Sequence, residues 1–192
     1  MSASTRIRRI ATVTAGTFLA AGLMAGLATP ASAAPRDCAY MGYGSYVDGL
    51  ALDHRDGEVV LANAINAYRA QNGLRPLTYS RTLARPAMWA SLDSFNRGFS
   101  PSNHVDTRGM DVAQRVQFCS GYTGYLGEIN FWGYGSSPSY SSPEAALNWW
   151  KNSPGHNARL LDPHATTFAV GQAYNGYPTI DRAHYTVVFG DH

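Results

Sequence analysis

Helical sequence patterns fill the early and middle parts of this chain, and two strand patterns close it. Leu61, Ile65 and Tyr68 recur at helical spacing, which predicts a helix over 57–72. Gly73 then stands where a left-handed C-cap belongs. Because a strand–helix–strand alternation is missing from this order, a parallel sheet built from βαβ units is excluded, and an α+β domain is favoured.

The other predicted elements follow from capping residues and from breaks at Gly and Pro. They are a helix from Ser80 to about Arg97, a short helix over 110–118, a loop over 133–143, a helix from a Ser141 cap to about Asn152, a short helix over 156–161, and strands over 167–174 and 183–189. No internal repeat interrupts this order, so one domain is expected.

The amino-terminal segment has the pattern of a secretory signal peptide. Arg6, Arg8 and Arg9 precede an apolar run from Ile10 to Leu27, and a small-residue cleavage site follows, most simply after Ala33. The alternative is a transmembrane anchor, but that needs about 20 strongly apolar residues, and this run is rich in Ala, Gly and Thr. We therefore expect residues 1–33 to be removed and a secreted, extracellular protein without a transmembrane segment in its mature form.

Removal of this leader changes the charge balance. The leader holds three of the 15 Lys and Arg residues and none of the 13 Asp and Glu residues, so 12 basic residues remain against 13 acidic ones, a net charge of −1. Nucleic-acid binding would need a basic stripe. We expect no nucleic-acid partner.

The chain has two cysteines, Cys38 and Cys119. In an oxidising compartment an even pair predicts a disulfide, which would tie an amino-terminal extension over 34–56 to the domain over 57–192. Two unpaired buried thiols are the alternative. Neither cysteine belongs to a CxxC motif, so redox catalysis and a cysteine-based zinc site are not expected.

Four titratable residues are candidates for chemistry: His104, Glu128, His156 and His184. Imidazole and carboxylate groups bind divalent metals, and histidine also serves as a general acid or base near neutral pH. The spacing of these residues matches no compact metal motif. Separate surface or hydrogen-bonded histidines are the simpler interpretation of spacing alone.

Several ordered motifs over residues 61–189 carry a family resemblance. They are LANAINAYRAQNGLRPL over 61–77, Asn103-His104, Arg115, Gly127-Glu128, WKNSPGHNARLL over 150–161, and His184-Tyr185-Thr186. Together they resemble the CAP superfamily of cysteine-rich secretory, antigen 5 and pathogenesis-related proteins, in its bacterial SCP-like form. The box around Ser153-Pro154-Gly155-His156 is the most specific of these motifs.

The resemblance implies a three-layer α-β-α sandwich with a central antiparallel sheet and a cleft. In well-known members of the family two His and two Glu line the cleft and hold a divalent cation. His104, Glu128 and His184 match three of these positions and are therefore predicted ligands for Zn²⁺, Mg²⁺ or Ca²⁺. The fourth carboxylate falls near Ser153 and is absent.

Three further departures bear on the site: Ile129 separates Glu128 from Asn130, Val187 replaces a Gln, and Asn157 replaces an Arg of the family motifs. Two alternatives follow from three remaining ligands. The site could hold zinc with an open coordination position, or the loss of a carboxylate could leave it without metal.

Ser153 and His156 are also cleft candidates. A nucleophile–base pair is one interpretation, but Ser153 as a helix cap is simpler. Trp132, Trp149 and Trp150 are predicted to be core or cleft-wall residues rather than carbohydrate platforms. Tyrosines of the 133–143 loop are better candidates for partner contact.

Three functions are compatible with the sequence. The first is a secreted binding module whose cleft recognises an extracellular ligand, such as an envelope component, a lipid or a protein. The alternative is a metal-assisted hydrolase acting on an envelope or nucleotide substrate, with Glu128 as general base and His104 and His184 as ligands. A structural envelope protein is the third. Fold resemblance alone does not choose among them.

Overall fold

The computed structural model describes residue 38 and residues 56–135, 140–176 and 181–192. The predicted signal peptide over 1–33 lies outside the described residues, as does the 34–56 extension apart from Cys38 and Asp56. Within the described ranges, no helix is both long and apolar enough to cross a membrane.

Four strands form one mixed sheet in the order β1-β3-β4-β2. They are β1 (Thr78–Tyr79), β2 (Leu126–Gly135), β3 (Thr167–Gly176) and β4 (Asp181–Gly190). β4 pairs antiparallel with both β3 and β2, whereas the short β1 pairs parallel with β3. The three long strands are therefore antiparallel as predicted, and only β1 makes the sheet mixed.

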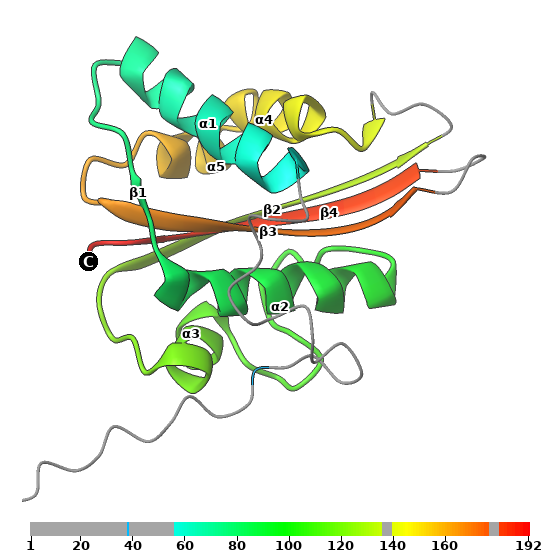
Figure 1. Ribbon diagram of the computed structural model, residues 1–192. Helices are drawn as coiled ribbons and strands as arrows, with labels where there is room; N and C mark the ends of the chain where they lie inside the picture. The colour runs from blue at the N-terminus through cyan, green and yellow to red at the C-terminus, as the bar shows by residue number, and fades with distance from the viewer. Residues whose placement is uncertain (1–37, 39–55, 136–139, 177–180) are drawn as a thin grey trace, which may run out of the picture. The chain divides into compact units, whose positions relative to one another are not determined.

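Helices cover both faces of this sheet (Figure 1). One layer contains α1 (Asp56–Gln71), α4 (Pro143–Lys151) and α5 (Pro154–Leu160), and the other contains α2 (Arg81–Arg97) and α3 (Val112–Ser120). This arrangement confirms the predicted α+β fold with three α-β-α layers. The strand β2 is at one edge of the sheet, so side chains from both helix layers can meet around it.

Alternating side chains of the strands build an apolar core on each face. Tyr185 and Phe189 of β4 belong to the cluster that includes Trp150 of α4, whereas Val188 belongs to the cluster with Leu83 of α2. Helix α2 lies so close to β3 that a Cβ on Gly171 would come within 2.4 Å of the backbone of Ala87. Glycine at that position is what permits this approach.

Helix α5 is anchored to α1 by a buried arginine. Arg69 donates from Nη1 to the carbonyl oxygens of Leu160, at 2.7 Å, and Asp162, at 3.0 Å. Tyr68 donates its hydroxyl to Asn157 Oδ1 at 2.9 Å. These bonds satisfy carbonyls at the carboxyl end of α5 and so fix the helix that carries the Ser-Pro-Gly-His box.

Neither β1 nor β2 was predicted from the sequence. The predicted loop over 133–143 is therefore wrong at its start, because β2 continues through Gly133 to Gly135. Glycine favours loops in general, which is why this segment has a loop-like composition. Here it has a packing role: a Cβ on Gly133 would come within 1.8 Å of the carbonyl oxygen of Tyr140. The returning chain therefore requires glycine inside the strand.

The predicted cap at Ser141 is also wrong by one residue. Ser142 is the N-cap of α4, and its hydroxyl accepts from the backbone N–H of Ala145 at 3.1 Å. Pro143 occupies the first turn of the helix, where a missing N–H costs nothing. Ser141 is buried instead.

Cys38 and Cys119 form the predicted disulfide. Both cysteines are buried and pack with Trp89 of α2, while Cys119 lies near the end of α3. The bridge joins two residues that are 81 positions apart in the sequence. It therefore fastens the segment before α1 to the layer formed by α2 and α3.

Replacing both cysteines by Ala is expected to lower the free energy of unfolding by about 2–4 kcal/mol, because a long loop in the unfolded chain is released. Urea unfolding of the purified protein measures this loss. Adding a reductant to the wild type should produce a similar loss, and an unchanged unfolding midpoint in both experiments would contradict the structural role.

Candidate functional site

Glu128 and Asn130 lie on the edge strand β2, on the sheet face covered by α2 and α3. Their strand partners on β4 are Val188 and Thr186, and alternation places Glu128 and Asn130 on the same face. Both side chains are buried. The strand thus holds a carboxylate and an amide in a rigid geometry beside the loop between α2 and α3.

His104 reaches these groups from that loop with an unusual backbone conformation. Its φ is 58°, and His104 is the one described non-glycine residue with positive φ. A side chain in this region costs about 1–3 kcal/mol, so the surrounding loop must hold it. Arg97 donates to the carbonyl of Val105 at 2.8 Å, and Asp93 accepts from both the backbone and the hydroxyl of Thr107.

Glu128 is bound by three donors. Its Oε1 is 2.9 Å from Nδ1 of His104 and 3.4 Å from the amide nitrogen of Asn130, and its Oε2 accepts from Arg115. Arg115, on α3, is buried and also lies 4.0 Å from Asp106. An ionised carboxylate only accepts hydrogen bonds, so Nδ1 of His104 is the donor in its bond with Glu128.

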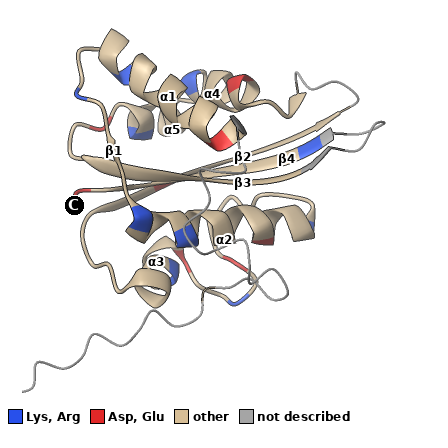
Figure 2. Cartoon of the chain, in the orientation of Figure 1, with Lys and Arg blue, Asp and Glu red and all other residues tan. Residues whose placement is uncertain are grey.

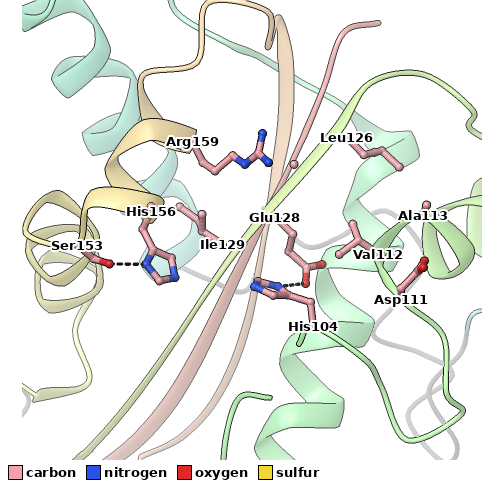
Figure 3. Close-up of a pocket in the computed structure, with 12 residues that line it drawn as sticks. His104, Asp111, Val112, Ala113, Leu126, Glu128, Ile129, Ser153, His156 and Arg159 are labelled. Carbon is pink, nitrogen blue, oxygen red and sulfur yellow. Dashed lines mark hydrogen bonds and ion pairs between the residues drawn. The ribbon is translucent and has the colours of Figure 1, made fainter. Parts of the chain in front are cut away.

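A cleft of about 600 Å³ lies between His104 and Glu128 on one wall and Ser153, His156 and Arg159 of the α5 region on the other. Figure 3 shows the imidazoles of His104 and His156 directed toward each other, on either side of β2 in this view. Burial, and then the charge of His104, lowers the pKa of His156. His156 is therefore a neutral hydrogen-bonding group at physiological pH.

The predicted pair of Ser153 and His156 is brought together. The Ser153 hydroxyl lies 2.8 Å from Nδ1 of His156, and it makes no capping hydrogen bond, although Ser153 is the N-cap residue of α5. The prediction of Ser153 as the helix cap is confirmed for its position, but its hydroxyl bonds to the imidazole of His156 and not to the first N–H groups of the helix. Among the described residues, no carboxylate is hydrogen-bonded to His156 to complete a triad.

Among the described residues, His184 is not hydrogen-bonded to the other predicted ligands, which bond to each other. Its side chain is fully buried, and its Nδ1 is 3.4 Å from the hydroxyl of Ser100. The rings of Phe95 and Trp132 lie 5.8 Å and 6.4 Å from its own ring. The described residues that line the cleft do not include it.

The predicted metal ligands do not fit a divalent cation in this arrangement. Within residues 38, 56–135, 140–176 and 181–192, no three His, Cys, Asp or Glu side chains are grouped to hold one ion. The reason is visible at Glu128, where the buried guanidinium of Arg115 binds one oxygen and His104 the other. A metal at Oε1 would have to replace the hydrogen bond from His104, and the charge of this carboxylate is already balanced by Arg115.

A second hollow adjoins the cleft. It is a groove of about 440 Å³ whose walls include Trp132 of β2, Trp149 of α4, and His104 and His156, which it shares with the cleft. Trp132 is 48% exposed and Trp149 50%, whereas Trp150 is fully buried. Trp150 is thus a core residue and Trp132 and Trp149 are groove-wall residues, as predicted, but the exposed faces of the latter two are open for a ligand to stack on. Sequence patterns did not predict that Trp132 and Trp149 share one groove. The one sequence pattern that relates Trp132 to the site is its strand alternation with Glu128 and Asn130.

Comparisons with known proteins agree with this architecture. The sequence profile of the CAP family, described as the Cysteine-rich secretory protein family, matches residues 62–189. Among solved structures, an outer surface protein from Borrelia burgdorferi matches with a TM-score of 0.54 and 20% identity, over 70% of this chain and 91% of that one. An extracellular protein containing a SCP domain from Bacillus anthracis str. Ames matches with a TM-score of 0.52 and 23% identity, over 71% of this chain and 40% of that one. A search of curated proteins finds no match.

The buried pair of Arg115 and Glu128 is expected to be strongly coupled. Replacing Arg115 by Met should lower the free energy of unfolding by about 3–5 kcal/mol, since it leaves a buried carboxylate without its cation. Adding Glu128→Gln to that variant should restore part of the loss. Urea unfolding of both single variants and the double variant measures the coupling.

Arg159→Met is the matched control, because its pair with Asp162 is half exposed and 3.6 Å long. An exposed pair of this kind is worth less than about 1 kcal/mol. Additive losses for Arg115→Met and Glu128→Gln would contradict the coupling.

His184 is expected to make folding sensitive to acid. Burial, and then the charge of Arg182, lowers its pKa from 6.5 to about 4, so the folded protein keeps the imidazole neutral. The stabilisation is complete above pH 6.5 and is lost as the pH falls from 6.5 toward 4, because the unfolded chain binds the proton first. At about 1.4 kcal/mol per pH unit, the loss reaches about 3 kcal/mol.

Urea unfolding over this pH range should show a shallower acid dependence for His184→Gln than for the wild type. In NMR spectra of the folded protein, the His184 ring resonance should not titrate near pH 6.5. A ring that titrates at its ordinary pKa would disprove the expectation.

Proposed function

Because the chain belongs to the cysteine-rich secretory protein family, we propose that it is an exported binding module whose cleft takes an extracellular ligand. The ligand class proposed for the cleft is a component of the cell envelope. The observation that carries the proposal is the cleft itself, in which His104, Ser153 and His156 present polar atoms that the rest of the fold holds in place.

Export is supported by three independent features. The predicted signal peptide precedes the domain, the disulfide between Cys38 and Cys119 is typical of oxidising compartments, and similar solved structures carry the descriptions outer surface protein and extracellular protein. Charges of both signs are interspersed over both helix layers (Figure 2), a distribution that suits neither nucleic acid nor an anionic membrane as partner.

Ligand binding through hydrogen bonds is supported by the placement of the two imidazoles. Glu128 holds His104 through Nδ1, and the neutral His156 lies across the cleft beside the Ser153 hydroxyl. Binding sites commonly combine such a few polar groups with apolar walls, here Ile129 and Val112. The cleft therefore suits a ligand with several hydrogen-bonding groups.

The alternative of a metal-assisted hydrolase receives less support. It needs Glu128 as a general base, but Arg115 and His104 already bind both oxygens of that carboxylate. It also needs His104 and His184 to share an ion, and the two residues lie in different environments. We therefore propose that ligand binding does not depend on a resident Zn²⁺, Mg²⁺ or Ca²⁺.

The test is co-sedimentation of the purified chain with a cell-envelope fraction from the organism that encodes it. His156→Ala should weaken binding about tenfold or more, whereas His164→Ala should leave it unchanged, because His164 is exposed and outside the cleft. The wild type should bind equally well in the presence of a metal chelator and in the presence of added Zn²⁺, Mg²⁺ or Ca²⁺. Equal binding by both variants, or binding that requires a cation, would overturn the proposal.

A further inference from the structure

The groove beside the cleft has two half-exposed indoles on its walls, and they come from different layers of the fold. Trp132 projects from the edge strand β2, and Trp149 from α4. Each ring is supported from one side: the ring of His184 stacks on Trp132 at 6.4 Å, and the ring of His156 lies 4.7 Å from that of Trp149. The indoles are therefore held in place while half of their surface remains open.

Packing behind these indoles restricts their side chains before a ligand binds, so binding costs less side-chain conformational entropy. Phe131 lies 6.0 Å from Trp149 and 6.4 Å from the buried Trp150, so Trp149 rests on the apolar core. Trp150 in turn donates its indole N–H to the carbonyl of Asn130 at 2.9 Å, which fastens α4 to β2. Rigid aromatic side chains of this kind provide contact area at low conformational cost.

The polar groups of the groove are hydroxyls, an amide and imidazoles. Ser100, Ser102 and Asn130 supply hydroxyl and amide groups, and His104 and His156 supply imidazoles. Among the described residues that line the groove, none is Asp, Glu, Lys or Arg. A charged ligand would lose its hydration there without gaining a counter-charge.

These features together select one class of ligand. A fatty acyl chain would remove water from the hydroxyl and amide groups and leave them without hydrogen-bond partners. A nucleotide would bring phosphates into a groove whose described lining has no Lys or Arg. A pyranose ring has apolar C–H faces that stack on indoles and hydroxyl groups along its edge that bond to neutral donors and acceptors.

We infer that the groove between Trp132 and Trp149 binds one sugar ring of an uncharged glycan, an inference that rests on the proposed function and names its ligand class. The groove has about 440 Å³ and shares His104 and His156 with the cleft of about 600 Å³. A linked second sugar would therefore enter the cleft, where the imidazoles meet its hydroxyl groups.

The test is calorimetric titration of the full chain with neutral tetrasaccharides: chitotetraose, cellotetraose and maltotetraose. At least one should bind saturably, and Trp149→Ala and Trp132→Ala should each weaken that binding about tenfold or more. Tyr174→Ala is the matched control, because this exposed aromatic residue lies on β3, outside the groove, and its removal should change nothing. The unfolding midpoints of both Trp variants are measured alongside, to separate a loss of binding from a loss of folding.

Tetragalacturonate and palmitate test the charged and apolar alternatives. Tighter binding of either one than of every neutral tetrasaccharide would overturn the inference, as would a lack of saturable sugar binding or an unchanged affinity in both Trp variants. If sugars do not bind but envelope binding still depends on His156, only the glycan inference fails. If sugars do not bind and envelope binding does not depend on His156, the proposed function fails as well.

Discussion

The buried pair of Arg115 and Glu128 links three parts of the molecule that are distant in sequence. Arg115 comes from α3 and Glu128 from β2, and the same carboxylate binds His104 from the loop after α2. A buried carboxylate is tolerated only when a cation and hydrogen bonds compensate it. Because this compensation comes from Arg115, the orientation of His104, the shape of the cleft and the poor fit for a metal ion all follow from one interaction.

The position of β2 at the edge of the sheet explains why the cleft and the groove exist there. A central strand has neighbours on both sides, whereas side chains of an edge strand can face residues from both helix layers. His104 approaches β2 from the layer of α2 and α3, and Trp149 and His156 approach it from the layer of α4 and α5. The bond from Trp150 to the Asn130 carbonyl holds the second layer against this edge.

Much of this arrangement was predictable from local patterns. Helical spacing located α1 and α2, and the pair of cysteines indicated the disulfide. The strand β2 was not predicted, and its end lies at Gly133 and Gly135, which have a loop-like composition that only the crossing of Tyr140 explains. The ligand role assigned to His184 lacks structural support for a similar reason: matching motifs align positions along the chain, but burial next to Phe95 and Trp132 decides what a side chain can reach.

The sequence by itself determined the helices, the two closing strands, the family resemblance, and the residues His104, Glu128, Ser153, His156 and His184 as candidates for one cleft. These features depend on the spacing of residue types and on short motifs, which are local. Only the tertiary structure decided that β1 and β2 complete the sheet, that Arg115 neutralises Glu128, that His184 is buried beside Phe95 and Trp132, and that Trp132 and Trp149 face one groove. Such contacts depend on strand register and on how two helix layers meet at a sheet edge, and no local pattern encodes that meeting.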